Sequence, residues 1–182
     1  MATIPFHRVN VLTGVKGAMA IEDPVQYANQ IKRSRRPLLI LGRRVLEIEL
    51  GGKSLLDYAI EIADASRAPI CATAHVAKAM IDKGRKPEST YDVIEIVNFL
   101  KDPEWKGVKG EGNHDLVMFL GFRTDIGNQA LSTLKHFAPH LRTMTLCKFY
   151  YPNADYSLPT ILKDEVWKEF LDRLIEELKK GG

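Results

Sequence analysis

The 182-residue sequence has only two cysteines, Cys71 and Cys147, which lie far apart and outside any Cys-x-x-Cys pair. An iron–sulfur cluster needs about four thiolate ligands, so this chain cannot hold such a cluster alone. Each cysteine falls in an apolar run, which favours a small core residue over a metal ligand. The sequence therefore predicts no metal centre, no iron–sulfur cluster and no structural disulfide.

Long hydrophobic runs and a large net charge are also missing. No apolar run approaches the ~20 residues of a membrane-spanning helix, and the first ten residues lack the features of a signal peptide. The net charge is +3, from 26 Lys and Arg against 23 Asp and Glu, without the basic face of a nucleic-acid-binding protein. We expect one cytoplasmic domain over residues 1–182, with no nucleic-acid or membrane partner; residues 1–21 are a candidate extended arm.

Short apolar runs alternate with segments of helical periodicity. Uninterrupted apolar runs, typical of strands buried on both faces, predict strands at 37–42, 69–74, 115–121 and 141–147. Capping residues and apolar spacing predict helices at about 24–33, 54–63, 76–83, 93–100, 130–137 and 163–179. Strands that alternate with helices form right-handed βαβ units. The predicted fold class is therefore α/β, an open parallel sheet with helices on both faces.

Three segments are harder to assign. Residues 45–50 alternate like a strand but follow the preceding strand so closely that we favour a short helix or turn. Ser89 and Asp92 have the spacing of a capping box, so both are assigned to a helix start. Residues 150–159 contain proline and asparagine and are expected to form a loop.

Basic or imidazole side chains follow each predicted strand. Ligands of open parallel sheets bind outside the carboxyl ends of the strands, where helix N-termini attract anions. The candidate cofactor-binding residues at these ends are Gly42, Arg43, Arg44, Thr73, Ala74, His75, Gly121, Phe122, Arg123, Thr124 and Lys148. They predict a site for a phosphate-bearing or otherwise anionic ligand. The alternative is that these are ordinary lysines and arginines of surface loops.

The motifs of better-defined sites are absent. No Gly-x-Gly-x-x-Gly follows the first strand, and there is no P-loop sequence. His114, His136 and His140 fall at the opposite, helix-to-strand edge of the sheet, which favours a structural role. No serine or cysteine has a His–Asp partner that the sequence can show, so no catalytic residue is predicted.

Six blocks of sequence between Pro24 and Pro159 resemble the small epsilon subunits of the archaeal carbon monoxide dehydrogenase/acetyl-CoA decarbonylase/synthase complex. These blocks are 56–63, 72–75, 98–107, 110–116, 131–141 and 152–157. The resemblance implies a Rossmann-like fold of the deoxyhypusine-synthase-like NAD/FAD-binding type. It also implies association with the large alpha subunit, two copies of each, as the carbon monoxide dehydrogenase component; self-association is expected as well.

In that family the metal clusters lie in the large subunit, and the whole complex reversibly cleaves acetyl-CoA in methanogens and related anaerobic archaea. The resemblance implies that this chain is a non-catalytic accessory subunit. Its role is to stabilise the assembly or to assist electron transfer to FAD, the cofactor that it would bind. Two alternatives stay open: a stand-alone NAD- or FAD-dependent enzyme, and a purely structural clamp with an empty cleft.

Overall fold

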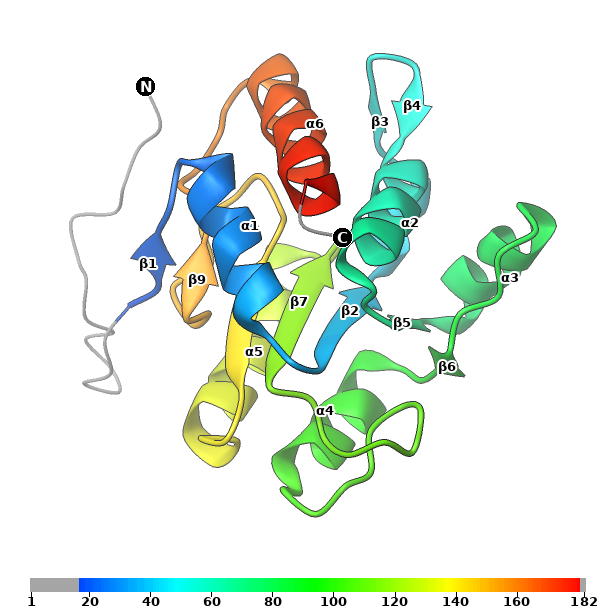
Figure 1. Ribbon diagram of the computed structural model, residues 1–182, viewed down its shortest axis with the longest axis vertical. Coiled ribbons are helices and arrows are strands. Elements are labelled where there is room, and N and C mark those ends of the chain that lie inside the picture. The colour runs from blue at the N-terminus through cyan, green and yellow to red at the C-terminus, as the bar shows by residue number, and fades with distance from the viewer. Residues whose placement is uncertain (1–16, 181–182) are drawn as a thin grey trace.

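The computed structural model describes residues 17–180 and shows a parallel sheet flanked by helices (Figure 1). The seven strands lie in the spatial order β1 (Met19–Ala20), β9 (Tyr156–Ser157), β8 (Arg142–Thr145), β7 (Leu116–Leu120), β2 (Pro37–Leu41), β5 (Ile70–Ala72) and β6 (Ser89–Thr90). The helices are α1 (Pro24–Arg33), α2 (Leu55–Ser66), α3 (Ala74–Asp82), α4 (Val93–Lys101), α5 (Thr124–Phe137) and α6 (Asp164–Lys179), and a 3-10 turn, η1 (Arg43–Leu46), follows β2.

The strand order is that of a Rossmann fold. Without β1, the strands of this sheet are ordered 3-2-1-4-5-6 when numbered along the chain. The order reverses between β2 and β7, which pair in parallel from Pro37 and Leu116 to Leu41 and Leu120. Helices α1, α6 and α2 pack side by side, and α4 packs beside α5. Right-handed crossovers place these two groups on opposite faces, which confirms the predicted α/β fold class.

The central strands are buried as their composition predicts. Every residue of β2 and β7 is buried, because helices cover both faces of the sheet. The predicted helix starts at Asp23, Ser54 and Asp92 are also confirmed. Each of these side chains accepts a hydrogen bond from a backbone N–H of the first turn, as N-cap residues do.

The structure corrects several local assignments. Residues 45–50 are not one helix or turn: η1 ends at Leu46, and β3 (Glu49–Leu50) then pairs with β4 (Lys53–Ser54) in a small hairpin. Ser89 belongs to the edge strand β6, so only Asp92 caps α4. The expected loop at 150–159 contains β9. All of these strands have two residues, too few for any periodic signal in the sequence.

The predicted arm, residues 1–21, is described only from residue 17 onward. Within that part, β1 pairs in parallel with β9, and Met19 lies opposite Tyr156. The end of the predicted arm is therefore the edge strand of the sheet. Residues 1–16 lie outside the described residues.

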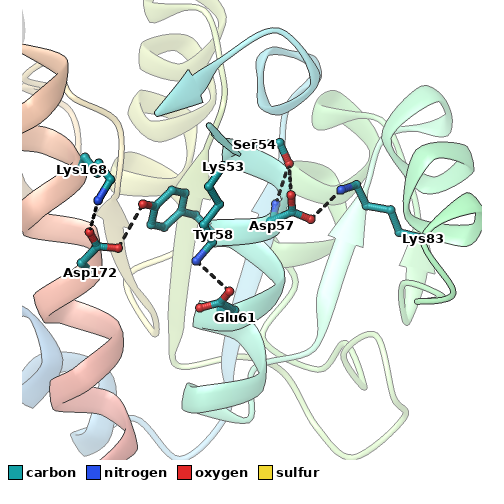
Figure 2. A network of polar contacts seen from close by, with 8 residues as sticks. All are labelled: Lys53, Ser54, Asp57, Tyr58, Glu61, Lys83, Lys168 and Asp172. Atoms are coloured by element: carbon teal, nitrogen blue, oxygen red, sulfur yellow. Dashed lines mark hydrogen bonds and ion pairs between the residues drawn. The ribbon is translucent and has the colours of Figure 1, made fainter. Parts of the chain in front are cut away.

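Polar contacts fasten α2 to α3 and α6 (Figure 2). The carboxylate of Asp57 lies 2.6 Å from the ammonium of Lys83, at the end of α3, and also accepts a hydrogen bond from the Ser54 hydroxyl. These two partners hold the pKa of Asp57 below its ordinary value. On the other side of α2, the buried Tyr58 donates a hydrogen bond of 3.0 Å to Asp172 of α6. Helix α2 is thereby held between its two neighbours.

Two turns, each with a glycine, contact each other where the strand order reverses. Gly42 follows β2, and a Cβ there would overlap the carbonyl oxygen of Gly121 and lie 2.8 Å from the ring of Phe122. Gly121 follows β7 with φ +76°, and a Cβ there would lie 2.8 Å from the backbone nitrogen of Val45. The Arg44 N–H also donates a 2.9 Å hydrogen bond to the Gly121 carbonyl. Glycine at both positions therefore lets the two turns touch.

We predict that Gly121→Ala destabilises the fold much more than Gly110→Ala. Both glycines have φ +76°, but a Cβ at Gly110 would meet nothing within 4 Å among the described residues. The positive φ costs each variant about 1–2 kcal/mol, and overlap with Val45 costs Gly121→Ala a further ~1–3 kcal/mol. Urea unfolding monitored by circular dichroism measures both. If both variants lose the same free energy of unfolding, close contact between the two turns is not what requires glycine at position 121.

Candidate functional site

A cleft of about 790 Å³ opens at the carboxyl ends of β2, β5, β6 and β7. It lies where the strand order reverses, which is the position at which Rossmann folds receive their ligands. The residues that line it are Gly42, Arg43, Arg44, Glu47, Thr73, Asp92, Val93, Gly121, Phe122, Arg123 and Ile126. The cleft is therefore built by four strand ends and by the turns and helices that follow them.

Seven of the predicted site residues lie together in this cleft: Gly42, Arg43, Arg44, Thr73, Gly121, Phe122 and Arg123. The other four do not line it. Ala74 and His75 are exposed on the first turn of α3, and Thr124 is exposed at the start of α5. Lys148 lines a neighbouring pocket.

Sequence reasoning missed four residues of the cleft: Glu47, Asp92, Val93 and Ile126. Asp92 and Val93 directly follow β6, a strand too short to recognise. Had the edge strand been identified, the rule on strand ends would have found both. Glu47 follows η1 in the ambiguous segment, and Ile126 lies in the first turn of α5, before the part of that helix that the sequence predicted.

The arginines of the cleft make exposed ion pairs with neighbouring carboxylates. Arg43 and Arg44 lie 3.6 and 3.9 Å from Glu47, and the Arg43 side chain is 74% exposed. Arg123 pairs with Asp125 at 2.7 Å, yet its side chain is 72% exposed. A hydrogen bond from the Ile126 backbone, and then Arg123, hold the pKa of Asp125 below its ordinary value. Exposed pairs contribute little to stability, so the guanidinium groups can turn towards an anion.

The N-terminus of α3 provides a second feature that suits an anion. Thr73 is the N-cap residue, but its side chain makes no capping hydrogen bond within the described chain, and the first turn of α3 has no acidic residue. The Thr73 hydroxyl oxygen is buried and has no hydrogen-bond partner among residues 17–180. A buried hydroxyl without a partner is costly. A phosphate oxygen at the edge of the cleft would satisfy both this hydroxyl and the free N–H groups of the helix.

Gly42, in contrast, does not provide the open cradle of a dinucleotide-binding loop. In such loops a glycine lets the backbone approach the pyrophosphate closely. Here the space beside Gly42 is filled by the backbone of Gly121 and the ring of Phe122. The cleft therefore fits a phosphate group at Thr73 and the arginines, with the apolar side chains of Phe122, Val93 and Ile126 beside it.

A smaller pocket of about 300 Å³ adjoins the cleft between η1 and α6. The two cavities share Arg44, Glu47, Gly121 and Phe122. Lys148 lines the smaller pocket, where its ammonium lies 2.6 Å from Asp164. One bound molecule could therefore reach from the cleft into this pocket.

Both cysteines are buried free thiols. Burial raises the pKa of Cys71 and of Cys147, which keeps both protonated and unreactive. Among residues 17–180, no group of three or more His, Cys, Asp or Glu side chains is placed to hold a metal ion.

Two of the histidines make structural contacts at the amino edge of the sheet. His114 accepts a hydrogen bond of 3.3 Å at Nε2 from the Val108 N–H, and its Nδ1 lies 3.1 Å from the Arg36 carbonyl oxygen. His140 Nε2 lies 3.0 Å from the carbonyl oxygen of Leu100. Burial holds the pKa of His114 below its ordinary value, so His114 stays neutral and can accept from Val108.

The strand order and the cleft define a Rossmann-type α/β protein with a basic site where the strand order reverses. Residues 1–178 match the family described as "CO dehydrogenase beta subunit/acetyl-CoA synthase epsilon subunit". The chain belongs to this family.

Similar proteins bear names of the same kind. The chain is 40% identical over 167 residues to the acetyl-CoA decarbonylase/synthase complex subunit epsilon of Methanothermobacter thermautotrophicus, covering 92% of each chain. It is 39% identical to subunit epsilon 1 of Archaeoglobus fulgidus, over 85% of this chain and 82% of that one. A Mycobacterium smegmatis protein described as a thiamin diphosphate-dependent enzyme superposes on 88% of this chain and 28% of its own, with 16% identity and a TM-score of 0.48. No helix within residues 17–180 has the length and apolar character to cross a membrane.

We predict that the protein loses stability as the pH falls below about 6.5, and that His114 accounts for part of the loss. The folded-state pKa of His114 is lowered by burial from the ordinary value of 6.5. The contribution of neutral His114 to the free energy of unfolding is therefore complete above pH 6.5. It declines as the pH falls, because the unfolded chain then takes up a proton at this residue and the folded one does not. Urea unfolding at pH 7.5 and 5.5 should show a smaller pH dependence for His114→Gln than for the wild type. The exposed His136→Gln is the control, and an equal pH dependence in all three proteins would refute the assignment.

Proposed function

We propose that this chain is a non-catalytic accessory subunit of an acetyl-CoA decarbonylase/synthase complex, and that its cleft binds a phosphate-bearing nucleotide, FAD. The chain joins the large alpha subunit, two copies of each, as the carbon monoxide dehydrogenase component. There it stabilises the assembly and assists electron transfer to FAD during CO oxidation.

One observation supports the binding site above all others. Arg43, Arg44, Arg123 and Thr73 line one cleft, and the buried Thr73 hydroxyl, at the N-terminus of α3, has no hydrogen-bond partner within residues 17–180. Arginine and free backbone N–H groups are the groups that bind phosphate in proteins. Since these residues come from three different strand ends, the fold itself assembles the site.

The residues suit FAD in two respects. The three arginines and Thr73 would hold its diphosphate, and the ring of Phe122 offers an apolar wall to a planar ring. FAD, when bound, supplies one- and two-electron transfer. The chain's own residues contribute binding and orientation.

The carboxylates that line the cleft, Glu47 and Asp92, make structural contacts within this chain, which supports a non-catalytic role. Asp92 accepts a 2.8 Å hydrogen bond from the Glu95 N–H and caps α4. Glu47 lies between Arg43 and Arg44.

The names of the relatives support the proposed assembly. Proteins that are 32 to 40% identical to this chain are named as epsilon subunits of the acetyl-CoA decarbonylase/synthase complex. A subunit of such a complex has partner chains. The resemblance of the sequence to this family supports the large alpha subunit as the direct partner that we propose, and a second copy of this chain as a further one.

We predict that Arg43→Ser combined with Arg123→Ser weakens FAD binding about a hundredfold or more, because each of the two lost charge-assisted hydrogen bonds contributes ~1.5–3 kcal/mol. Quenching of flavin fluorescence measures the dissociation constant. Arg35→Ser with Lys109→Ser removes the same charge outside the cleft and should leave binding unchanged. Equal affinities of the cleft variant and the wild type would refute the site.

A second experiment separates the proposal from its two alternatives. With CO as electron donor, the purified chain and FAD should show no turnover, and adding the large subunit should start FAD reduction. Turnover by the chain alone would identify a stand-alone enzyme. A melting temperature that saturating FAD leaves unchanged would indicate a structural clamp, because a ligand that binds only the folded state must raise it.

A further inference from the structure

The amino edge of the sheet, opposite the cleft, carries a small basic pocket. It is formed by the turn before β2, the end of α2 and the loop before β7. We propose that this pocket is a docking site for an acidic segment of a partner protein, whose Asp or Glu carboxylate binds among Arg35, Arg67 and Lys109. The segment belongs to the large subunit, so this inference rests on the proposed function.

The size and charge of the pocket suit a carboxylate. Its volume is about 80 Å³, room for two or three water molecules at ~30 Å³ each and too little for a nucleotide. The lining residues are Arg35, Arg36, Pro37, Arg67, Pro69, Lys109, Glu111, Gly112 and His114. Four of them are cationic and only Glu111 is acidic.

None of the four cations has an ion-pair partner within residues 17–180. The nearby carboxylate of Asp115 does not neutralise them. It accepts hydrogen bonds from the Ser34 hydroxyl and from the backbone N–H groups of Arg35 and Arg36, at 2.8 and 2.9 Å. The arginines of the cleft, in contrast, each lie beside an acid of this chain.

Two backbone features place arginines at this pocket: a left-handed conformation at Arg67 and a glycine, Gly112, beside Arg36. Arg67 ends α2 in the left-handed conformation, with φ +56°, and is the only non-glycine residue among 17–180 with a positive φ. Glycine adopts this conformation without strain. Gly112 in turn leaves the space that the Arg36 guanidinium occupies, 2.6 Å from where a Cβ would lie. An arginine at a position better suited to glycine indicates a use for its charge.

An aromatic surface continues from the pocket. The ring of His114 lies 5.8 Å from that of Trp105, and Trp105 stacks on Phe99 at 5.5 Å with an angle of 16° between the planes. Phe99 is 36% exposed on α4. Arginine and aromatic side chains are enriched in protein–protein interfaces. The partner segment therefore combines a carboxylate with an apolar side chain that covers Phe99 and Trp105.

The pocket fits a protein better than a nucleic acid. A polyanion needs a continuous basic stripe, whereas these four cations surround a single small cavity beside Glu111 and an aromatic surface. One carboxylate satisfies such a cavity. Binding of a nucleic acid at this pocket would exclude a protein docking site.

The test is the affinity of the full chain for the purified large subunit, measured by calorimetry in ~50 mM and ~300 mM salt. The charge-reversal variant Arg35→Glu with Lys109→Glu should bind at least tenfold more weakly at low salt, and the difference should shrink at high salt. Lys78→Glu with Lys163→Glu is the matched control, since both lysines are exposed and have no ion pair among the described residues. The control should bind like the wild type.

Arg67→Gly gives a variant that keeps the fold. It removes one charge of the pocket and relieves the left-handed backbone, so its melting temperature should stay the same or rise while its affinity for the large subunit falls. Its FAD affinity should match that of the wild type.

Three results would overturn the inference. If the pocket variants bind the large subunit like the wild type, the docking site is wrong but the proposed function stands. If the wild type does not bind the large subunit at all, both fail. Tighter binding of duplex DNA or RNA than of the large subunit, lost in the pocket variants, would assign the pocket to a nucleic acid instead.

Discussion

The contact between the turns that follow β2 and β7 determines the shape of the carboxyl edge of the sheet. The Gly42 N–H donates to the Leu120 carbonyl and the Arg44 N–H donates to the Gly121 carbonyl, both at 2.9 Å. These bonds hold η1 across the end of the sheet. The turns can come close enough to form them because neither glycine has a side chain. As a result, Arg43 and Arg44 stand beside the cleft and a smaller pocket opens on the other side of η1. The same close contact fills the space in which other Rossmann folds receive a pyrophosphate.

The cations at the two edges of the sheet differ in whether they are paired with carboxylates. At the carboxyl edge the arginines lie beside Glu47 and Asp125, in exposed pairs that an incoming phosphate can replace. At the amino edge Arg35, Arg67 and Lys109 have no such partners within residues 17–180, and His114, which lines the same pocket, contacts the ring of Trp105. One edge is suited to a small anionic ligand and the other to a protein surface. These two edges match the two roles that we propose for the chain, binding a nucleotide and docking on a larger partner.

Much of this fold could be predicted from the sequence, and the limits have physical causes. β2 and β7 are uninterrupted apolar runs because helices cover both of their faces, so the sequence pattern predicts them directly. β6 and β9 have two residues each and leave no periodicity, so the sequence wrongly favours a helix cap at Ser89 and a loop over residues 150–159. The rule on strand ends brought seven candidate residues into one cleft but missed Asp92, which follows the unrecognised β6. Nothing local in the sequence shows that Arg67 joins Arg35, since that pocket depends on how three segments meet.

In the proposed site, the phosphate of a nucleotide binds at the N-terminus of α3, beside the arginines of η1. Amide hydrogen exchange with and without saturating FAD tests it directly, because bound phosphate must slow the exchange of the N–H groups that it contacts. We expect protection in the first turn of α3, at Ala74 and His75, and in η1, with little change in the loop before β7. Protection elsewhere, with the first turn of α3 exchanging as fast as in the free protein, would contradict it.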